Sequence, residues 1–488
     1  MSISRNLTHA TLWGTFWSYA SFYSGKLMVF VSTVVLARLL SEEDFGVAGY
    51  ALVIISFLQV MSDLGTGQAV IYHRDDPDAP YTGFWLSLGL GTLLFLITWV
   101  GAPLVGIFFQ DPRAVPVTRF LGLVFPITAI GNTHDVLLRR DLSFGRKFVP
   151  DFARAFSKGV ISILLAFLGL GAWSLIFGQV SGRIAGTITL WRTYPWRPRR
   201  RFNPRLARQL LAYGINIVLV GALGMLIANA DYLLIGRYMG AAALGIYTLA
   251  FRIPDLVVMQ FCYIIGRVIF PVYASLRDDP AALRKGFLNT ARYVSLVTVP
   301  LGLGMALVAR PLVLTFFTGK WEAAIEPMRA IAIYALTLSL AYNVGDVYKA
   351  QGRPQILTYI SLGRLAVLLP GLWWAVTRLQ TIVAVGWVHA AIAFTTGVVE
   401  LYLASRLMET PFREIASALS PALSAGTVMA LIVGAALTLS GGLPSWVQLS
   451  IAVSGGALAY LGFLWFVQRP ILLEAGSVLR SALRREKS

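Results

Sequence analysis

Ten lysines and arginines of this sequence lie inside long apolar stretches, where a positive charge is costly unless it meets water or an anion. They are Lys26, Arg119, Arg154, Lys158, Arg183, Arg252, Arg267, Arg292, Arg329 and Arg364. The acids in or next to these stretches are fewer: Asp135, Asp151, Asp231, Asp255 and Glu400. Full pairing would leave about five cations over. This surplus favours an anionic ligand over a cationic one.

The spacing of some of these residues indicates which of them act together. Lys147, Asp151, Arg154 and Lys158 are separated by 4, 3 and 4 residues, which places them on one face of a helix. An alternative is that Asp151 pairs with Arg154 while Lys147 reaches the membrane surface, which leaves Lys158 unexplained.

Two other stretches contribute to the same candidate site. Tyr19, Tyr23 and Lys26 share a helical face, as do Gln179 and Arg183. Beside the last pair, small residues recur at Gly178, Gly182 and Gly186, a pattern that permits close helix packing. The expected substrate-binding residues are Lys26, Arg154, Lys158, Arg183, Tyr19, Tyr23 and Gln179.

The overall composition indicates a membrane protein. Of 488 residues, 57% are hydrophobic and 13% are charged, whereas soluble proteins are about 25% charged. The one cysteine, Cys262, excludes an internal disulfide and a Cys-ligated metal cluster, and the four histidines lack metal spacing. We therefore expect no metal and no cofactor. The sequence also lacks the P-loop, HExxH and nucleophile-elbow motifs, which disfavours ATP-driven transport and hydrolysis.

Fourteen apolar stretches are long enough to cross a bilayer as helices. They cover residues 12–36, 45–62, 81–104, 117–138, 148–170, 172–191, 209–233, 244–270, 288–308, 325–344, 355–376, 381–403, 417–439 and 444–467. No cleavage site follows the first stretch, so we expect it to be retained as a helix. The sequence predicts an all-α polytopic membrane protein with about 14 transmembrane helices.

Lysine and arginine are distributed unequally between the two sets of connections. The set that includes both termini carries 25, and the opposite set carries six. This bias predicts cytoplasmic termini. It accounts for most of the net charge of +18 without a nucleic-acid partner, and the arginines of 192–208 are expected to face anionic lipid headgroups.

An internal repeat divides the chain. Arg38 and Gly46 match Arg237 and Gly245 at an offset of 199, and two further matches follow in order. Pro103-Leu104-Val105 matches Pro311-Leu312-Val313, and Asn132-x-x-Asp135-Val136 matches Asn343-x-x-Asp346-Val347. Six helices separate each pair, so the copies have the same orientation. The predicted parts are an N-lobe (1–191), a basic cytoplasmic loop (192–208), a C-lobe (209–411), two further helices (412–467) and a basic cytoplasmic tail (468–488).

Several segments resemble a known family of membrane transporters. They are Ala37-Arg38-Leu39-Leu40-Ser41-Glu42-Glu43-Asp44-Phe45-Gly46, Asp63-Leu64-Gly65, Gly171-Ala172-Trp173-Ser174-Leu175, Asp231-Tyr232-Leu233-Leu234-Ile235-Gly236-Arg237, Leu244-Gly245-Ile246-Tyr247 and Gln351-Gly352-Arg353-Pro354. Their combination resembles the Wzx-type polysaccharide and lipopolysaccharide export flippases. These belong to the polysaccharide transporter family of the multidrug, oligosaccharidyl-lipid and polysaccharide exporter superfamily.

The resemblance implies two six-helix lobes around a central cavity, plus two C-terminal helices. It implies a monomeric flippase, not an enzyme, in the bacterial inner membrane. Its cargo would be an undecaprenyl-pyrophosphate-linked oligosaccharide, moved from the cytoplasmic to the periplasmic leaflet by alternating access. Polysaccharide polymerase and assembly enzymes are the expected protein partners.

Alternatives to this function and to its energy source remain open. A peptidoglycan-precursor flippase of the same superfamily would show the same charge pattern, and a membrane glycosyltransferase or polymerase would be an enzyme. A multidrug cation antiporter would need an excess of carboxylates. The sequence does not choose between Na⁺, H⁺ and no coupling ion. The candidate coupling positions are Asp63, Asp135, Asp231 and Asp346, each near a helix end where a structural cap is the other interpretation.

A reporter fused after Arg200 tests the predicted orientation. Alkaline phosphatase placed there should be inactive and a cytoplasmic fluorescent reporter should be bright, because the loop carries seven arginines. Active phosphatase at this position would overturn the orientation.

Overall fold

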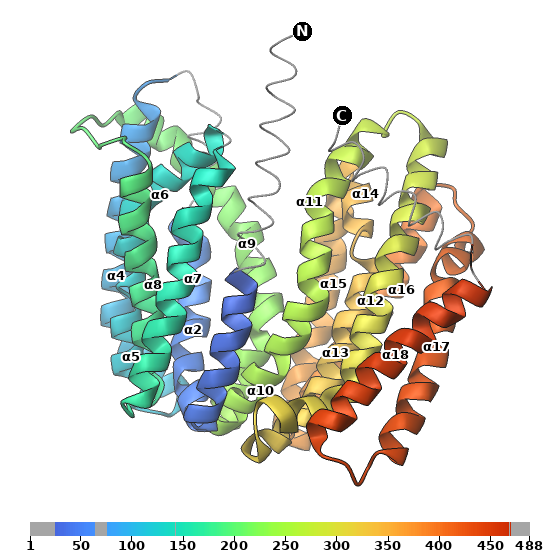
Figure 1. Ribbon diagram of the computed structural model, residues 1–488. Helices are drawn as coiled ribbons and strands as arrows, with labels where there is room; N and C mark the ends of the chain where they lie inside the picture. The colour runs from blue at the N-terminus through green and yellow to red at the C-terminus, as the bar shows by residue number, and fades with distance from the viewer. Residues whose placement is uncertain (1–24, 64–75, 142, 468, 470–488) are drawn as a thin grey trace. The chain divides into compact units, whose positions relative to one another are not determined.

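The computed structural model describes residues 25–63, 76–141, 143–467 and 469. Within these ranges the chain is helical and contains no β-strand. The chain consists of two compact units, Met1–Gly245 and Ile246–Ser488. Figure 1 shows long helices running roughly side by side within each unit.

The first unit begins, within the described residues, with a helix over 25–39. The helices that follow are α2 (Glu42–Asp63), α4 (Ala79–Phe109), α5 (Ala114–Leu121), α6 (Val124–Arg140), α7 (Phe144–Phe167), α8 (Ala172–Thr193), α9 (Pro204–Tyr238) and the start of α10 (Gly240–Pro254). The predicted helix over 117–138 is broken at Gly122 and Leu123, where the chain turns between α5 and α6.

The second unit contains the rest of α10 and all later helices. They are a π-helical turn (Asp255–Met259), α11 (Gln260–Ser275), α12 (Pro280–Phe316), a 3₁₀ helix (Gly319–Ala324), α13 (Ile325–Ala341), α14 (Val344–Ala350), α15 (Gln355–Trp374), a second π-helical turn (Ala375–Leu379), α16 (Ile382–Leu407), α17 (Phe412–Leu439) and α18 (Ser445–Val467). The last two helices pack against α12, and the Tyr460 hydroxyl donates to the Leu296 carbonyl at 3.0 Å.

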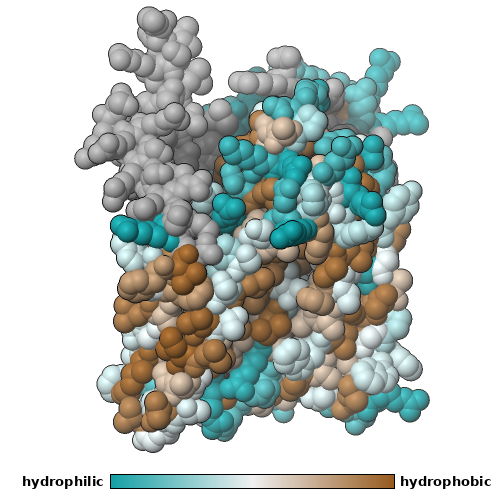
Figure 2. Space-filling model, turned by 90° about the vertical axis from the view of Figure 1, so that its right-hand side faces the viewer, coloured by the Kyte–Doolittle hydropathy of each residue, from teal (hydrophilic) through white to brown (hydrophobic). Residues whose placement is uncertain are grey.

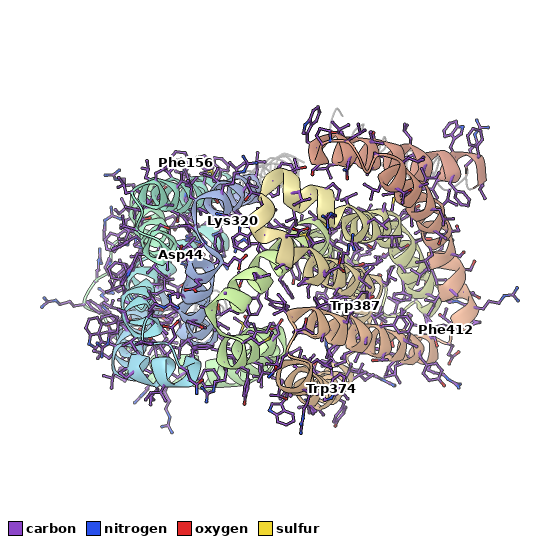
Figure 3. All side chains as sticks on the ribbon, turned by 90° about the horizontal axis from the view of Figure 1, so that it is seen from below. Asp44, Phe156, Lys320, Trp374, Trp387 and Phe412 are labelled. Carbon is purple, nitrogen blue, oxygen red and sulfur yellow. The ribbon has the colours of Figure 1, made fainter. Side chains whose placement is uncertain are left out.

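The helices carry the apolar surface that a bilayer requires. Ten helices in the described residues are long and apolar enough to cross a membrane, so the chain is a multi-pass membrane protein. Figure 2 shows hydrophobic side chains gathered in a broad band on a face of the second unit. On α18, the side chains of Leu458 and Phe466 are 75% and 87% exposed. Trp374 and Trp387 are half exposed and project from α15 and α16 (Figure 3).

Helix starts follow local capping rules. The Asn203 side chain accepts hydrogen bonds from the amides of Arg205 and Leu206, and Pro204 occupies the first position of α9. The start of α12 repeats the arrangement, with the Asp279 carboxylate on the Ala282 amide. These caps satisfy amides that have no partner inside the helix.

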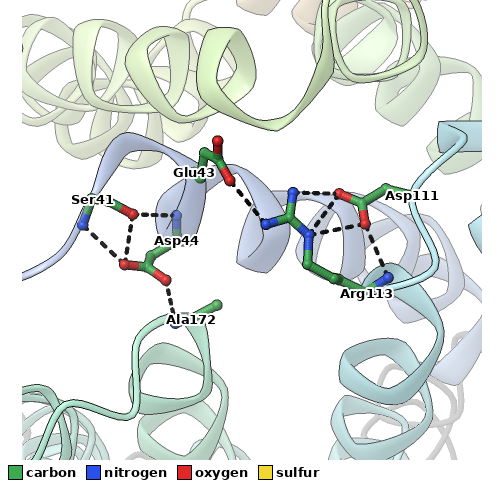
Figure 4. A network of polar contacts seen from close by, with 6 residues as sticks. All are labelled: Ser41, Glu43, Asp44, Asp111, Arg113 and Ala172. Atoms are coloured by element: carbon green, nitrogen blue, oxygen red, sulfur yellow. Dashed lines mark hydrogen bonds and ion pairs between the residues drawn. The ribbon is translucent and has the colours of Figure 1, made fainter.

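A polar network at the start of α2 fixes the start of α8 (Figure 4). The Asp44 carboxylate accepts from the Ser41 amide at 2.9 Å, from the Ser41 hydroxyl at 2.7 Å and, through its other oxygen, from the Ala172 amide at 2.8 Å. Ala172 is the first residue of α8, so an acid of α2 caps a helix that begins 128 residues later. Gly171 has φ +53° and leaves no room for a Cβ beside Asp44.

The same network holds the connection between α4 and α5. The Arg113 guanidinium binds Asp111 at 2.9 Å and reaches Glu43 of α2, also at 2.9 Å. Hydrogen bonds from Arg113 to Asp111 and Glu43 raise the pKa of this guanidinium, which therefore stays charged. The start of α2 thus contacts two connections that are distant in the sequence.

Backbone atoms come into contact where α2 meets the start of α10, within the first unit. A Cβ added to Gly46 would lie 1.8 Å from the Ala241 carbonyl oxygen, and one added to Gly245 would lie 1.9 Å from the Glu42 carbonyl oxygen. Gly46 and Gly245 are the two glycines matched in the sequence repeat. Only glycine fits at either position.

We expect Gly46→Ala to destabilise the protein by about 1–3 kcal/mol, because the added methyl forces two helix backbones apart. The melting temperature of the purified protein in detergent measures this effect. Gly89→Ala on α4 is the matched control, since its Cβ would meet no atom within 4 Å. Equal melting temperatures for the two variants would contradict the close crossing.

Candidate functional site

The contact between α7 and α8 is made by the glycines of α8. A Cβ on Gly182 would lie 2.8 Å from the Arg154 carbonyl oxygen and 2.9 Å from the Lys158 Cβ, and one on Gly178 would lie 2.8 Å from the Lys158 carbonyl oxygen. The close packing predicted for these small residues is confirmed. It brings the basic face of α7 directly against α8.

The charged residues of α7 form a chain of ion pairs that begins on α6. Lys147 pairs with Asp135 of α6 and lies 3.4 Å from Asp151, which in turn lies 3.7 Å from Arg154. The pairing of Asp151 with Arg154 is present, as the alternative interpretation expected. Lys147, however, contacts two carboxylates and is only 20% exposed.

The Arg154 side chain of α7 lies against α8 within one turn of Arg183, because it contacts α8 at Gly186. The Arg154 Nε is buried without a hydrogen-bond partner among the described residues. A Cβ on Gly186 would lie 2.9 Å from that Nε, so the absence of a side chain there makes room for the guanidinium. Two like charges on neighbouring helices are stabilised by an anion between or beside them.

Lys26 lies on a helix that packs against the same part of α7. A Cβ built on Gly25 of this helix would lie 4.0 Å from the Ala155 Cβ of α7. A Cβ built on Gly159 of α7 would lie 2.6 Å from the Met28 Cε of this helix. The structure therefore brings Lys26, Arg154, Lys158 and Arg183 onto three packed helices of the first unit. Gln179 lies on α8, one turn before Arg183. Tyr19 and Tyr23 lie outside the described residues.

The candidate coupling aspartates are placed as follows. Asp135 and Asp346, matched in the repeat, are each 8% exposed and paired with cations: Asp135 with Lys147 and Arg139, Asp346 with Lys349 at 3.1 Å. Asp231 is fully buried and accepts from the Tyr232 amide at 2.9 Å. Asp63 is the last residue of α2. Ion coupling at any of these four aspartates stays a prediction.

Among the described residues, no cluster of acids, histidines and cysteines is suited to a metal.

The basic loop after α8 is anchored in a way that the sequence did not reveal. The centre of the Trp196 ring lies 5.4 Å from that of Tyr81 and 5.9 Å from that of Phe84, and the Trp196 carbonyl is 3.0 Å from the His134 Nε2. The Trp85 indole donates to the Arg199 carbonyl at 2.9 Å. The loop is therefore attached to the ends of α4 and α6, and His134 serves this attachment.

Comparisons with known proteins agree with this architecture. A family profile described as "Polysaccharide biosynthesis protein" matches residues 35–326. The chain belongs to this family. The match covers more than half of the chain, including α2, the starts of α8 and α10, and all of the cationic positions except Lys26, Arg329 and Arg364.

Relatives of this family member match it over most of its length. Teichuronic acid biosynthesis protein TuaB of Bacillus subtilis is 28% identical over 94% of this chain and 96% of its own. Lipopolysaccharide biosynthesis protein WzxC of Escherichia coli is 23% identical over 75% of each chain. Succinoglycan biosynthesis transport protein ExoT of Rhizobium meliloti is 25% identical over 80% of this chain and 82% of its own.

Solved structures show the fold to which this family member belongs. The lipid II flippase MurJ in an inward closed conformation matches with a TM-score of 0.76 at 13% identity, over 94% of this chain and all of the MurJ chain. A multidrug transporter of the MATE family in an inward-facing conformation matches with a TM-score of 0.64 at 13% identity, over 79% of this chain and 94% of its own. The predicted transporter fold is confirmed.

We expect Asp135→Asn to lower the stability of the protein by about 1–3 kcal/mol, because Lys147 and Arg139 lose a buried carboxylate. Thermal unfolding in detergent measures the loss. Asp151→Asn is the control and should cost less, since Asp151 is 33% exposed and its contacts are 3.4 and 3.7 Å long. If the larger loss belonged to Asp151→Asn, Asp135 would not be the centre of the ion-pair chain.

Proposed function

We propose that this protein is a flippase that moves an undecaprenyl-pyrophosphate-linked oligosaccharide across the bacterial inner membrane, from the cytoplasmic to the periplasmic leaflet. The observation that carries the proposal is the placement of Arg154, whose buried Nε has no partner among the described residues, against α8 within one turn of Arg183 in a transporter fold. Asp151, 3.7 Å from Arg154, supplies one negative charge to this pair, and a pyrophosphate supplies more. Membership in a polysaccharide biosynthesis family supports a glycan as the other part of the cargo.

The relatives support the same class of cargo. Their names refer to the biosynthesis of teichuronic acid, lipopolysaccharide and succinoglycan, and ExoT is named as a transport protein. A precursor of such a polymer carries a charged headgroup and several sugars on a lipid. The cationic positions take the headgroup, the glycan occupies polar surface within the protein, and the hydrocarbon tail stays in the bilayer.

The proposed mechanism is alternating access without covalent chemistry. Lys26, Arg154, Lys158 and Arg183 hold the headgroup while the site is open to the cytoplasm. A conformational change then exposes the site to the other side. Both termini lie in the cytoplasm, and the protein acts as a monomer with polymerase and assembly enzymes as partners. Movement of an anion outward is favoured by an inside-negative potential, so the return of the empty carrier is the step at which coupling to Na⁺ or H⁺ would act, if there is a coupling ion.

The test is made in cells depleted of the protein. Complete undecaprenyl-pyrophosphate-linked repeat units should accumulate on the cytoplasmic side, and their sugars then identify the cargo. Incomplete units, or complete units already facing outward, would point to an assembly or polymerisation step and disprove the flippase function.

Rescue of these cells tests the cationic site. Lys158→Ala should lower export roughly 10- to 100-fold, which corresponds to the loss of a charge-assisted contact of about 1.5–3 kcal/mol. The abundance of the Lys158→Ala variant in the membrane should equal that of the wild-type protein. Lys285→Ala, at an exposed position of α12, is the control and should export normally. Normal export by Lys158→Ala would remove this residue from the site.

A further inference from the structure

A cavity of about 280 Å³ lies between α2, α4 and α6 in the first unit. Its polar wall is made by Gln59 and Ser62 in the last turn of α2 and by Thr128 and Asn132 of α6, while Phe125 and Gly91 line the rest with apolar surface. None of the described residues that line it is charged. The cavity is therefore separate in character from the cationic positions of α7 and α8.

The cavity follows from how the three helices pack. A Cβ on Gly91 of α4 would lie 2.8 Å from the Ala129 Cβ and 3.0 Å from the Phe125 carbonyl oxygen, so α6 approaches α4 to backbone distance. Helix α4 packs along α6 and also contacts α2. Helices α2 and α6 make few contacts with each other. The space between α2 and α6 is a consequence of this arrangement and is lined by their polar side chains.

These side chains use only part of their hydrogen-bonding capacity within the protein. The Gln59 Nε2 donates to the Ser62 hydroxyl at 3.1 Å, and the Asn132 Nδ2 donates to the Ser87 hydroxyl at 3.4 Å, which is long for a hydrogen bond. Each amide can make four hydrogen bonds. The two carbonyl oxygens and the remaining N–H groups are thus able to serve a ligand that has both donors and acceptors.

The lining excludes other classes of ligand. An anion would need a cationic or densely amide-lined wall, and a coupling cation would need carboxylates. A hydrocarbon tail would leave the remaining groups of the two amides and the Thr128 hydroxyl without partners. Sugar hydroxyls both donate and accept, and the apolar face of a sugar ring can lie on Phe125. The volume is close to the lower limit of about 300 Å³ for small-ligand pockets, which suits one ring better than a whole repeat unit.

We propose that this cavity is a subsite for a sugar ring of the lipid-linked cargo, with Gln59 and Asn132 as its specificity-determining residues. This inference rests on the proposed function. Helix α6 links the subsite to the cationic positions, because Asn132 lines the cavity and Asp135, one turn later, pairs with Lys147 of α7. A single cargo molecule is thus held by its headgroup at α7 and α8 and by its glycan at α2 and α6.

Binding to the purified full-length protein in nanodiscs tests the subsite with two probes. One is sugar-free undecaprenyl pyrophosphate, and the other is the lipid-linked oligosaccharide purified from depleted cells. Gln59→Met and Asn132→Leu should each lower the affinity for the sugar-bearing probe about tenfold, since a buried polar contact is lost. Their affinity for the sugar-free probe should be unchanged, which also shows that they are folded.

Two comparisons separate the possible results. Gln448→Met is the matched control, because the Gln448 amide binds the Leu443 carbonyl on an exposed connection of the second unit; it should affect neither probe. Lys158→Ala should weaken both probes. Unchanged binding of the sugar-bearing probe by Gln59→Met and Asn132→Leu would overturn the subsite and leave the flippase function standing. Equal loss of both probes would assign the cavity to the headgroup and also overturn it. Failure of the wild-type protein to bind either probe would contradict the flippase function itself.

Discussion

Contact between helix backbones, made possible by glycine, is the constraint on which the first unit depends. In a bilayer, apolar side chains gain little by leaving lipid for protein, so helices associate where small residues allow close van der Waals contact. The glycines of α8 bring α7 so near that Arg154 and Lys158 pack directly on its surface. This contact places both cations on the surface of α8, and Arg154 also lies 3.7 Å from Asp151. Gly91 does the same for α4 and α6, and Gly46 and Gly245 do so for α2 and α10.

Three of the segments that resemble known flippases have a common structural role. Asp44 of the first segment, whose carboxylate also accepts from the Ser41 hydroxyl, caps α8 at Ala172, which belongs to a second segment. Gly46 contacts α10 beside Gly245 of a third. Such residues determine how helices meet, and none of them carries the surplus positive charge. This explains why the resemblance predicts the fold well and says little about which glycan is carried.

Local patterns predicted what depends on local physics. Apolar length predicted the helices, and the spacing of Lys147, Asp151 and Arg154 predicted their common face and, in the alternative interpretation, the pair of Asp151 with Arg154. The glycine period on α8 predicted its close packing. The number of residues between two charges is informative because, in a helix, it determines whether the two side chains lie on the same face. Contacts between distant residues were not predictable in this way. The attachment of Trp196 beside Tyr81 and the cavity between α2 and α6 depend on which helices are neighbours, and no spacing in the sequence relates the two amides that line that cavity.

The two ends of helix α2 have different roles, one in helix packing and one in lining the cavity. Its first turns make the capping and backbone contacts, in which a larger side chain at Gly46 has no space, whereas its last turn places Gln59 and Ser62 on the cavity wall. About 20 Å of helix separates these ends. Substitutions of Gln59 and Ser62 therefore alter the cavity without changing the contacts at the start of α2. A transporter built in this way can change its glycan over evolutionary time by a few replacements while its architecture stays the same.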